Sequence, residues 1–467
     1  MVNKNALAYA AATFGSSLIN SIFGFFYVKT FLNIYKINGW WFNTAQIIYM
    51  IWNAVNDPLF GYLQDSSNIK IFRVRSLAVL VGAPLYALSF LTPWFPLISE
   101  RPEWMVGLHL LFSLCFFDSL FTFVLLAHCA LFTEISPSAN DRAQLLKYSQ
   151  IASIMGSSAV FVADYVSDSQ KNFVNFQILC VIVAIISCVA MCYAGLNVKV
   201  DKKYEPVIDE KGDKKNGPTS VSWWSLTFQI CKQKNFVCFV IMNFLQIFHT
   251  TYSSNFFLIF AEELMGSQLP PFVRSLLAGS TFMIPQILGL LANPLIVKYG
   301  SYHIILSSFY IKLVMAVLLY LSGPNQILIL AAFFVLDKSI PSATFSQFNI
   351  PLSDIIDDDL AKHKRSSPIS SLVFGTNALF TKPAQSFAPM LIVAILSSYG
   401  YDDKSHTMKP TTSPGSLSSS ADLKTVMFNV MCFLPAIIAI LQILVWNSYT
   451  LRGRRDKTPE DERFDLQ

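Results

Sequence analysis

The chain has 467 residues, of which 53% are hydrophobic and only 13% are charged, with a formal net charge of +5. A soluble globular protein carries about 25% charged residues, so this composition excludes an ordinary soluble enzyme or binding domain. Apolar runs close to the ~20 residues that span a bilayer recur along the whole chain. The sequence therefore predicts an all-α polytopic membrane protein. No basic patch interleaved with aromatic residues indicates a nucleic-acid partner.

The apolar runs divide into twelve predicted membrane-spanning helices, six on each side of one polar segment. The first six lie near 7–34, 40–64, 76–97, 104–134, 141–166 and 172–197. The other six lie near 235–262, 271–298, 302–323, 325–353, 367–400 and 422–450. The polar segment, KVDKKYEPVIDEKGDKKNGPTSVSWW, is charged and interrupted by Gly and Pro, so it cannot bury a core of its own.

This pattern predicts two halves. The parts of the chain are an N-terminal six-helix half at 1–197, a cytosolic inter-half loop at 198–234, a C-terminal six-helix half at 235–451 and a cytosolic tail at 452–467. An internal similarity supports the division, because the second helix contains NDPLF and the second helix of the other half contains NPLI. Parallel repeats of six helices are one transporter architecture, with the substrate site near the membrane midplane between the halves.

Lysine and arginine are concentrated in the predicted loops on one side of the membrane. That side holds Lys70, Arg73, Arg75, Arg142, Lys202, Lys203, Lys211, Lys214, Lys215, Lys298, Lys362, Lys364, Arg365, Arg452, Arg454 and Arg455. Cytosolic loops carry an excess of these residues, so both termini are predicted to be cytosolic. We expect an integral, multi-pass protein of the plasma membrane or of an endosomal membrane.

The second predicted span carries polar groups in IWNAVNDPLFG, within an apolar stretch. An ionised group at the midplane costs about 2.5–3.5 kcal/mol on insertion scales and usually faces a cavity or a partner. Asn56 lies beside the polar face, and the proline after Asp57 removes a backbone hydrogen bond. These oxygens suit a hard cation or a proton site, and the alternative is a helix cap or a single interhelical hydrogen bond. The spacing places four polar residues on one helical face: Gln46, Asn53, Asp57 and Gln64.

Two more predicted spans carry polar groups of this kind. In the fourth span, Asp118 and Thr122 are four residues apart and share a face. In the eleventh span, FGTNALFTKPAQSFAP has one polar stripe with Lys382 beside it. A lysine of one half opposite carboxylates of the other suits a two-half transporter, because a bound cation or substrate competes for the acids. The alternative is a static buried salt bridge. The stripe consists of Asn377, Thr381 and Gln385.

Other polar groups of the spans are weaker candidates. Lys312 is a weaker candidate because a shift in the boundary of its predicted span would let its ammonium group reach the membrane surface. Asp337 and Lys338 are adjacent and so point in different directions. Ordinary packing is the alternative role for five further candidates for a cavity lining: Tyr27, Tyr49, His128, His249 and Tyr252. We find no nucleophile–base arrangement, metal-ligand spacing or phosphate loop, so we expect no enzyme activity, no metal site and no cofactor.

The motif WNAVNDPLFG at 52–61, with the charged residues that follow it, resembles the second-helix signature of the glycoside-pentoside-hexuronide:cation symporters. These symporters include the melibiose permeases and belong to the major facilitator superfamily. A closer resemblance, to an animal member of that superfamily, is carried by motifs spread over most of the chain. They are YKIN at 35–38, LCFFDSLF at 114–121, SANDR at 138–142, IIDDDL at 355–360 and LVFGTNALFTKPAQSFAP at 372–389.

The resemblance implies a role for several positions. Asp57 matches the carboxylate and Asn56 the amide of the symporter motif, whereas Asn53 falls where the symporters have another acid. Asp118 matches their fourth-helix acid at the sugar and cation site, and Lys382 matches their eleventh-helix lysine. Two further matches lie outside this set. Gln150 stands where the symporters have an arginine, and the stretch with Gly61, Asp65, Arg73 and Arg75 resembles the inner-gate loop, where charge pairing between loops steadies the outward-open state.

The resemblance also implies the fold and the function. The fold is that of the major facilitator superfamily, with twelve transmembrane helices in two six-helix halves. Because the first helix lacks the symporters' acid and Asn53 replaces another, a proton at Asp57 or Asp118 is favoured over Na⁺ as the coupling ion. We therefore predict a monomeric secondary transporter in the lipid bilayer that moves a small polar organic solute with H⁺ or Na⁺ by alternating access. The alternative is a non-transporting receptor or scaffold that retains the fold, which the loss of acids would suit.

Overall fold

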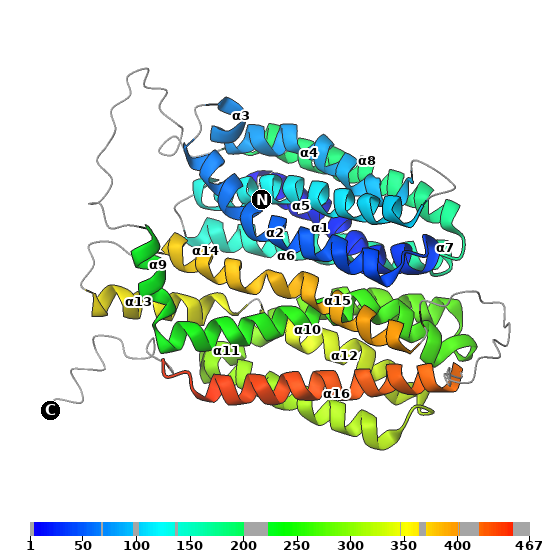
Figure 1. Ribbon diagram of the computed structural model, residues 1–467. Coiled ribbons are helices and arrows are strands. Elements are labelled where there is room, and N and C mark those ends of the chain that lie inside the picture. The colour runs from blue at the N-terminus through cyan, green and yellow to red at the C-terminus, as the bar shows by residue number, and fades with distance from the viewer. Residues whose placement is uncertain are drawn as a thin grey trace, which may run out of the picture.

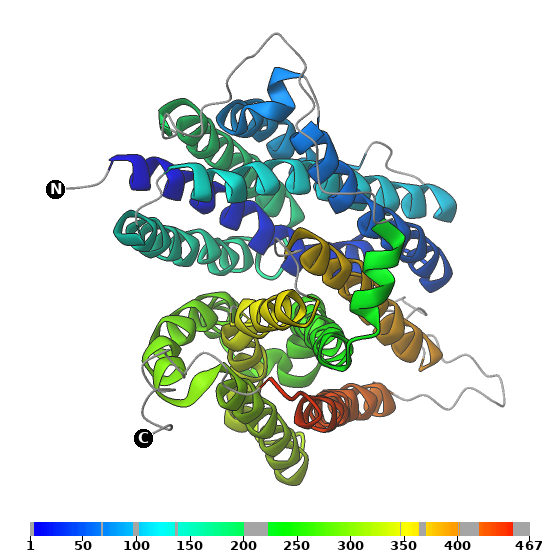
Figure 2. The ribbon, with the colours of Figure 1, turned by 90° about the vertical axis from the view of Figure 1, so that its left-hand side faces the viewer.

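The computed structural model describes residues 4–66, 69–96, 102–135, 139–199, 223–345, 347–363, 370–399, 401 and 420–451. Over these ranges the chain is built from helices, and no β-strand occurs among them. The helices gather in two bundles that lie side by side (Figure 1). The view along the helices in Figure 2 separates them clearly, with the blue and cyan helices in one bundle and the green to red helices mostly in the other.

The N-terminal bundle is formed by the first eight α-helices and two short irregular turns. They are α1 (Lys4–Lys29), the π-helical turn η1 (Thr30–Ile34), α2 (Gly39–Ser66), α3 (Lys70–Arg73), α4 (Arg75–Leu91), the 3₁₀ turn η2 (Thr92–Trp94), α5 (Glu103–Ile135), α6 (Ala139–Ser157), α7 (Ala159–Ser167) and α8 (Phe173–Asn197). The helix α2 runs through position 58, so the proline there removes one backbone hydrogen bond without ending the helix.

The C-terminal bundle is formed by the remaining helices. They are α9 (Trp223–Cys231), α10 (Lys234–Met265), the 3₁₀ turn η4 (Gly266–Gln268), α11 (Pro271–Ser322), α12 (Ile327–Phe345), α13 (Asn349–Lys362), α14 (Ser370–Thr381), α15 (Pro383–Ser398) and α16 (Ser420–Asn447). The short helix α9 lies in the part of the chain that the sequence predicts to be the inter-half loop, and α13 extends beyond the predicted span at 325–353.

Each predicted span overlaps helical structure, but three spans are divided and two are joined. The fifth span is α6 and α7, the tenth is α12 and part of α13, and the eleventh is α14 and α15. The predicted spans 271–298 and 302–323 are joined in α11 across a kink at Gly300, whose φ of 77° and ψ of 153° suit only glycine. Nine segments of the described chain are long and apolar enough to cross a membrane, so the number of twelve spans stays a prediction.

The helix α1 is enclosed because it packs on α6 and α8 of its own bundle and on α10 of the other. Buried residues therefore occur all along it, from Ala6 to Lys29. Close packing depends on glycine at one crossing, because a Cβ atom on Gly15 would lie 2.8 Å from the backbone oxygen of Ser187 in α8. Small residues at helix crossings let transmembrane backbones approach each other.

Contacts between the bundles are made by few helices. The helix α2 packs on α15, α6 and α7 pack on α11, and α1 packs on α10. In Figure 1, α15 runs along the lower edge of the N-terminal bundle, and α10 lies below it. Polar and charged side chains on these helices therefore meet between the bundles, and this is where the candidate site lies.

Candidate functional site

The sequence-predicted residues of the second and eleventh spans meet between the bundles. The Nζ atom of Lys382 lies 2.5 Å from Oδ1 of Asp57, and the two side chains are 18% and 29% exposed. Lys382 also donates to Oδ1 of Asn53 at 3.0 Å, while Asn53 donates to Oε1 of Gln385 at 3.1 Å. The helix α2 is thereby held to the junction of α14 and α15.

The position of Lys382 follows from the proline that comes after it. Pro383 occupies the first position of α15, where it has no backbone N–H to donate, and the chain between α14 and α15 turns there. Lys382 lies at this junction with helical φ and ψ of −59° and −35°. The residues before and after the junction contact different neighbours. Gln385 reaches α2, whereas Asn377 accepts a hydrogen bond from Asn243 of α10 within the C-terminal bundle.

Hydrogen bonds connect Asp57 to the second carboxylate of the site. Asn56 donates to Oδ2 of Asp118 at 2.8 Å and to Oγ1 of Thr122 at 2.9 Å. Thr122 in turn donates to Oδ1 of Asp57 at 3.0 Å. We call these four residues together with Lys382 the carboxylate cluster. With both acids ionised, the cluster has two negative charges and one positive charge.

Asp118 also lines a cavity of about 340 Å³ between the bundles. The helical period of 3.6 explains its walls, because α1 and α5 each present residues spaced by three, four and seven positions. The residues from α1 are Asn20, Phe23, Gly24 and Tyr27, and those from α5 are Leu114, Phe117, Asp118 and Phe121. The other lining residues are Tyr49 of α2, Thr250, Thr251, Ser254 and Asn255 of α10, Phe282 of α11 and Gln385 of α15.

Several sequence-predicted residues lie away from the carboxylate cluster. Thr381 donates to the backbone oxygen of Asn377 in its own helix. Gln150 makes a separate contact between the bundles by donating to Oε1 of Gln286 at 3.0 Å. Arg75 donates to the backbone oxygen of Gln64 at 3.1 Å and so ties the start of α4 to the end of α2. The side chains of three predicted inner-gate residues lie outside the described ones: Gly61, Asp65 and Arg73.

The five candidates for the cavity lining divide into two sets. Tyr27 and Tyr49 line the cavity. His128 stacks on Tyr9 at a ring-centroid distance of 4.1 Å, which is a packing role inside the N-terminal bundle. The remaining two, His249 and Tyr252, are buried in the C-terminal bundle.

A second group of buried charges lies within the C-terminal bundle. Nε2 of His249 lies 3.1 Å from each carboxylate oxygen of Asp337, and the two side chains are 0% and 5% exposed. Lys312 donates to Oε1 of Gln442 at 2.8 Å. Lys338 points away from its neighbour Asp337, as their adjacency predicts, and its Nζ atom lies 3.2 Å from the ring centroid of Phe282. Phe282 thus separates this lysine from the central cavity that it lines.

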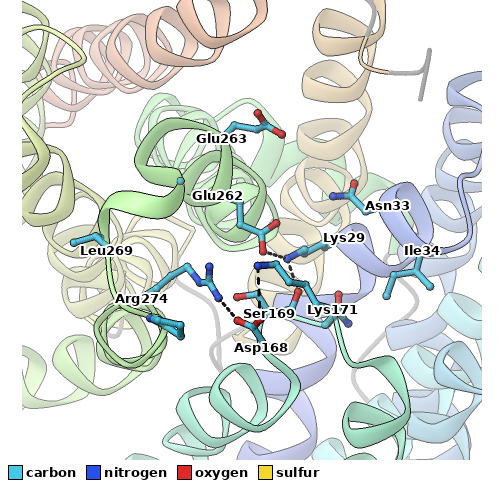
Figure 3. A pocket seen from close by; sticks show the side chains of 13 residues that line it. Lys29, Asn33, Ile34, Asp168, Ser169, Lys171, Glu262, Glu263, Leu269 and Arg274 are labelled. Carbon is cyan, nitrogen blue, oxygen red and sulfur yellow. Dashed lines mark hydrogen bonds and ion pairs between the residues drawn. The ribbon is translucent and has the colours of Figure 1, made fainter. Parts of the chain in front are cut away.

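A third group of charges joins the bundles at one end, where α7 and α10 finish (Figure 3). Nζ of Lys29 lies 2.6 Å from Oε1 of Glu262 and 2.6 Å from the backbone oxygen of Ser169. The guanidinium of Arg274 lies 2.8 Å from Oδ1 of Asp168. Both ion pairs link α1 or the α7–α8 turn to the C-terminal bundle, beside a pocket of about 610 Å³. We call this group the α7-end contacts.

The α7-end contacts were not predicted from the sequence. Each of their charged residues lies at or near the end of a helix, where a charge normally reaches water and needs no partner. The signal that was available is charge of opposite sign at the same end of neighbouring spans. Lys29 lies near the end of the first predicted span and Glu262 ends the seventh, and both spans finish on that side.

Comparison with known proteins identifies the kind of chain that carries this site. A family model described as MFS/sugar transport protein matches residues 8–452. The chain is 30% identical over 495 residues to Transmembrane protein 180 of Gallus gallus, covering 99% of this chain and 95% of the relative. It is 25% identical over 211 residues to an uncharacterized symporter of Synechocystis, covering 43% of this chain and 38% of the relative. These relatives confirm the resemblances to an animal member of the superfamily and to symporters.

Solved structures agree on the fold. The crystal structure of the nucleoside transporter NupG aligns with a TM-score of 0.60 at 14% identity, covering 95% of this chain and 99% of that chain. At that level of identity the likeness concerns the fold alone. The predicted architecture, a helical membrane protein of the major facilitator type, is confirmed.

Proposed function

Because this chain belongs to the MFS/sugar transport protein family, we propose that it is a secondary transporter of a small polar organic solute, coupled to H⁺ or to another cation. The two bundles are its two six-helix halves, and it works by alternating access. The observation that carries the proposal is the ion pair of Asp57 and Lys382, which joins the halves beside the cavity that Asp118 lines.

An ion pair between the halves supports coupling for an electrostatic reason. Lys382 attracts the nearby carboxylates because the charges are opposite and partly buried, whereas a proton or a cation bound to Asp57 removes that attraction. Binding at Asp57 therefore weakens the link between α2 and the α14–α15 junction. A change in the charge of one side chain thus alters the contact between the halves, which is what alternating access requires.

A proton fits the carboxylate cluster better than Na⁺ does. A hard cation takes six or more oxygen ligands, and several of the oxygens here already accept hydrogen bonds from Asn56 and Thr122. A proton needs one carboxylate oxygen only. Asp118 offers Oδ1, since Asn56 contacts its other oxygen.

The α7-end contacts support a state closed at one end. Charge patterning predicts that this end faces away from the cytosol, so Lys29–Glu262 and Asp168–Arg274 close the outer side. Both pairs must separate for the cavity to open outward. The described conformation is then closed on the outer side.

Uptake into proteoliposomes tests the proposal. The purified protein is first screened for thermal stabilisation at varied pH, Na⁺ and Li⁺ with sugars, amino acids, amines and organic acids. A ligand at ~100 times its Kd adds ~2.7 kcal/mol to the free energy of unfolding. Solutes that stabilise are then tested for uptake under an imposed proton or sodium gradient. We expect Asp57→Asn to abolish gradient-driven uptake, with Glu103→Gln, an exposed acid at the start of α5, as the matched control.

A receptor or scaffold predicts a different result. In that case Asp57 and Lys382 form a static pair, and Asp57→Asn changes stability without any effect on a solute flux. A folded protein that binds none of the solutes and transports none under either gradient would contradict the transport function.

A further inference from the structure

The walls of the central cavity combine one charge with many aromatic rings. Among the lining residues, which all belong to the described chain, Asp118 is the one that carries a formal charge. Six aromatic rings surround the same space: Phe23, Tyr27, Tyr49, Phe117, Phe121 and Phe282. A cavity of about 340 Å³ lies within the range of small-molecule sites.

Among the described side chains, no cation contacts the carboxylate of Asp118 directly. Its residue is 7% exposed, and Asn56 donates to Oδ2. The nearest lysine, Lys382, is engaged by Asp57 at 2.5 Å and by Asn53 at 3.0 Å. A buried charge is costly unless it is paired, so this carboxylate favours either a proton or a positively charged ligand in the cavity.

Aromatic rings next to a carboxylate suit one class of ligand. The face of an aromatic ring attracts a cation, and desolvated pairs of this kind are worth about 2 kcal/mol. Phe117 and Phe121 lie beside Asp118 on α5, and Phe23 of α1 stacks on Phe117 with ring centroids 3.6 Å apart, so each of these two rings has at most one face for a ligand. Tyr27 of α1 lines the cavity beside them. On the third side, Thr250, Ser254 and Asn255 of α10 provide oxygens for a hydroxyl group.

We propose, resting on the transport function proposed above, that the solute is an organic cation, a small amine or quaternary ammonium compound that carries a hydroxyl group. Its charged nitrogen lies between Asp118 and the rings of α1 and α5, and its hydroxyl group faces α10. While Asp118 is ionised and Lys382 is paired with Asp57, the charge of Asp118 repels an anion from the cavity. An uncharged polyol gains nothing from the aromatic walls beyond the burial of its carbon atoms.

The test compares a cation with its uncharged isostere on the purified full-length protein. Choline is the probe, and 3,3-dimethyl-1-butanol, in which carbon replaces the nitrogen, is the control ligand. Thermal-shift titrations in low-salt buffer give a Kd for each. We expect choline to bind at least tenfold more tightly than the isostere, which corresponds to about 1.4 kcal/mol. Equal affinities would overturn the proposal, and this comparison needs no variant to fold.

Substitutions of residues that line the cavity test which side chains contribute to choline binding. Asp118→Asn removes the charge and still accepts the hydrogen bond from Asn56, so we expect the Kd for choline to rise at least tenfold. Phe121→Leu should raise it about fivefold. The matched control is Phe112→Leu, on the same helix with its ring 57% exposed on the outer face, which should leave the Kd unchanged. An unchanged Kd in a folded Asp118→Asn protein would place choline elsewhere.

Flux measurements separate failure of this proposal from failure of the transport function. Gradient-driven uptake of an uncharged sugar, with no binding of choline, would overturn the organic-cation proposal and leave the transport function standing. Binding of choline that depends on Asp118, without uptake under any gradient, would support the ligand class and contradict transport. A rise in stability with acid alone, equal with and without choline, would assign Asp118 to a proton only and overturn the proposal.

Discussion

Lys382 and Asp57 face each other across the boundary between the two bundles, with Nζ and Oδ1 2.5 Å apart. One residue lies at the junction of α14 and α15, and the other lies in the middle of α2. Each side chain is partly buried, and each has a second polar partner, Asn53 for the lysine and Thr122 for the acid. The pair is therefore part of a network, and removing one member affects the others.

A double-mutant cycle measures the strength of this pair. Asp57→Asn and Lys382→Gln each leave the other charge without its partner, so we expect each to lower the free energy of unfolding by about 2 kcal/mol, less than for a fully buried pair. The double variant should be less destabilised than the sum of the two single variants, by about 1–2 kcal/mol. Reversible unfolding in detergent provides the measurement. Strict additivity would mean that the two side chains do not interact.

The contact between Lys382 and Asp57 agrees with an expectation from the sequence. Helical spacing places Asn53, Asp57 and Gln64 on one face, and the energetic cost of charge in lipid requires that face to meet a partner. A lysine in the eleventh span was the available counter-charge. The overall fold was predictable for the same kind of reason, since apolar runs of bilayer length occur along the whole chain.

The stripe of the eleventh span was predicted less well. Asn377, Thr381 and Gln385 lie on one face of their span, but this span packs on both α10 and α2. Asn377 therefore contacts Asn243 in its own bundle, and Gln385 alone reaches α2. The α7-end contacts were not predicted because a charge at a helix end has water as an alternative partner, so sequence alone does not require Lys29 to meet Glu262.

Replacing glycine by alanine should have opposite effects at the kink of α11 and in the regular helix α14. Gly300 has a φ of 77°, a conformation that is strained for any residue with a Cβ atom, so Gly300→Ala should lower the free energy of unfolding by about 1–3 kcal/mol. Gly375 lies in α14 with nothing within 4 Å of an added Cβ atom, so Gly375→Ala should be neutral or stabilising by up to about 1 kcal/mol. Thermal unfolding of both variants beside the wild type checks this. Equal effects at the two positions would argue against a glycine-dependent kink.

The buried pair of His249 and Asp337 should be important for stability. Asp337→Asn removes the carboxylate next to His249 and leaves the buried Lys312 without that negative charge. A buried hydrogen bond to a charged group is typically worth about 1.5–3 kcal/mol, and we expect a loss of about 2 kcal/mol. Thermal unfolding measures it. Glu103→Gln, which changes an exposed acid, serves as the control and should change stability by less than about 0.5 kcal/mol.

The α7-end contacts predict that charge controls access to the cavity. Arg274→Asp places an acid beside Asp168, so the two bundles repel each other at that end, and the exchanged pair Asp168→Arg with Arg274→Asp restores attraction. Access to the central cavity is measured as the rate at which a maleimide labels Ser254→Cys, a substitution of a residue that lines this cavity. The variant is made in a protein whose eight native cysteines have been replaced.

We expect Arg274→Asp to raise the labelling rate from the predicted outer side by about fivefold, which corresponds to about 1 kcal/mol in the equilibrium between closed and open forms. The exchanged pair should return the rate close to that of the parent. Because Asp168 is 46% exposed, salt should reduce the difference between the variants. A labelling rate that neither substitution changes would mean that other contacts keep this end closed. The Lys29–Glu262 pair would then be the first to replace, because Lys29 is almost fully buried and its ion pair is less screened by salt.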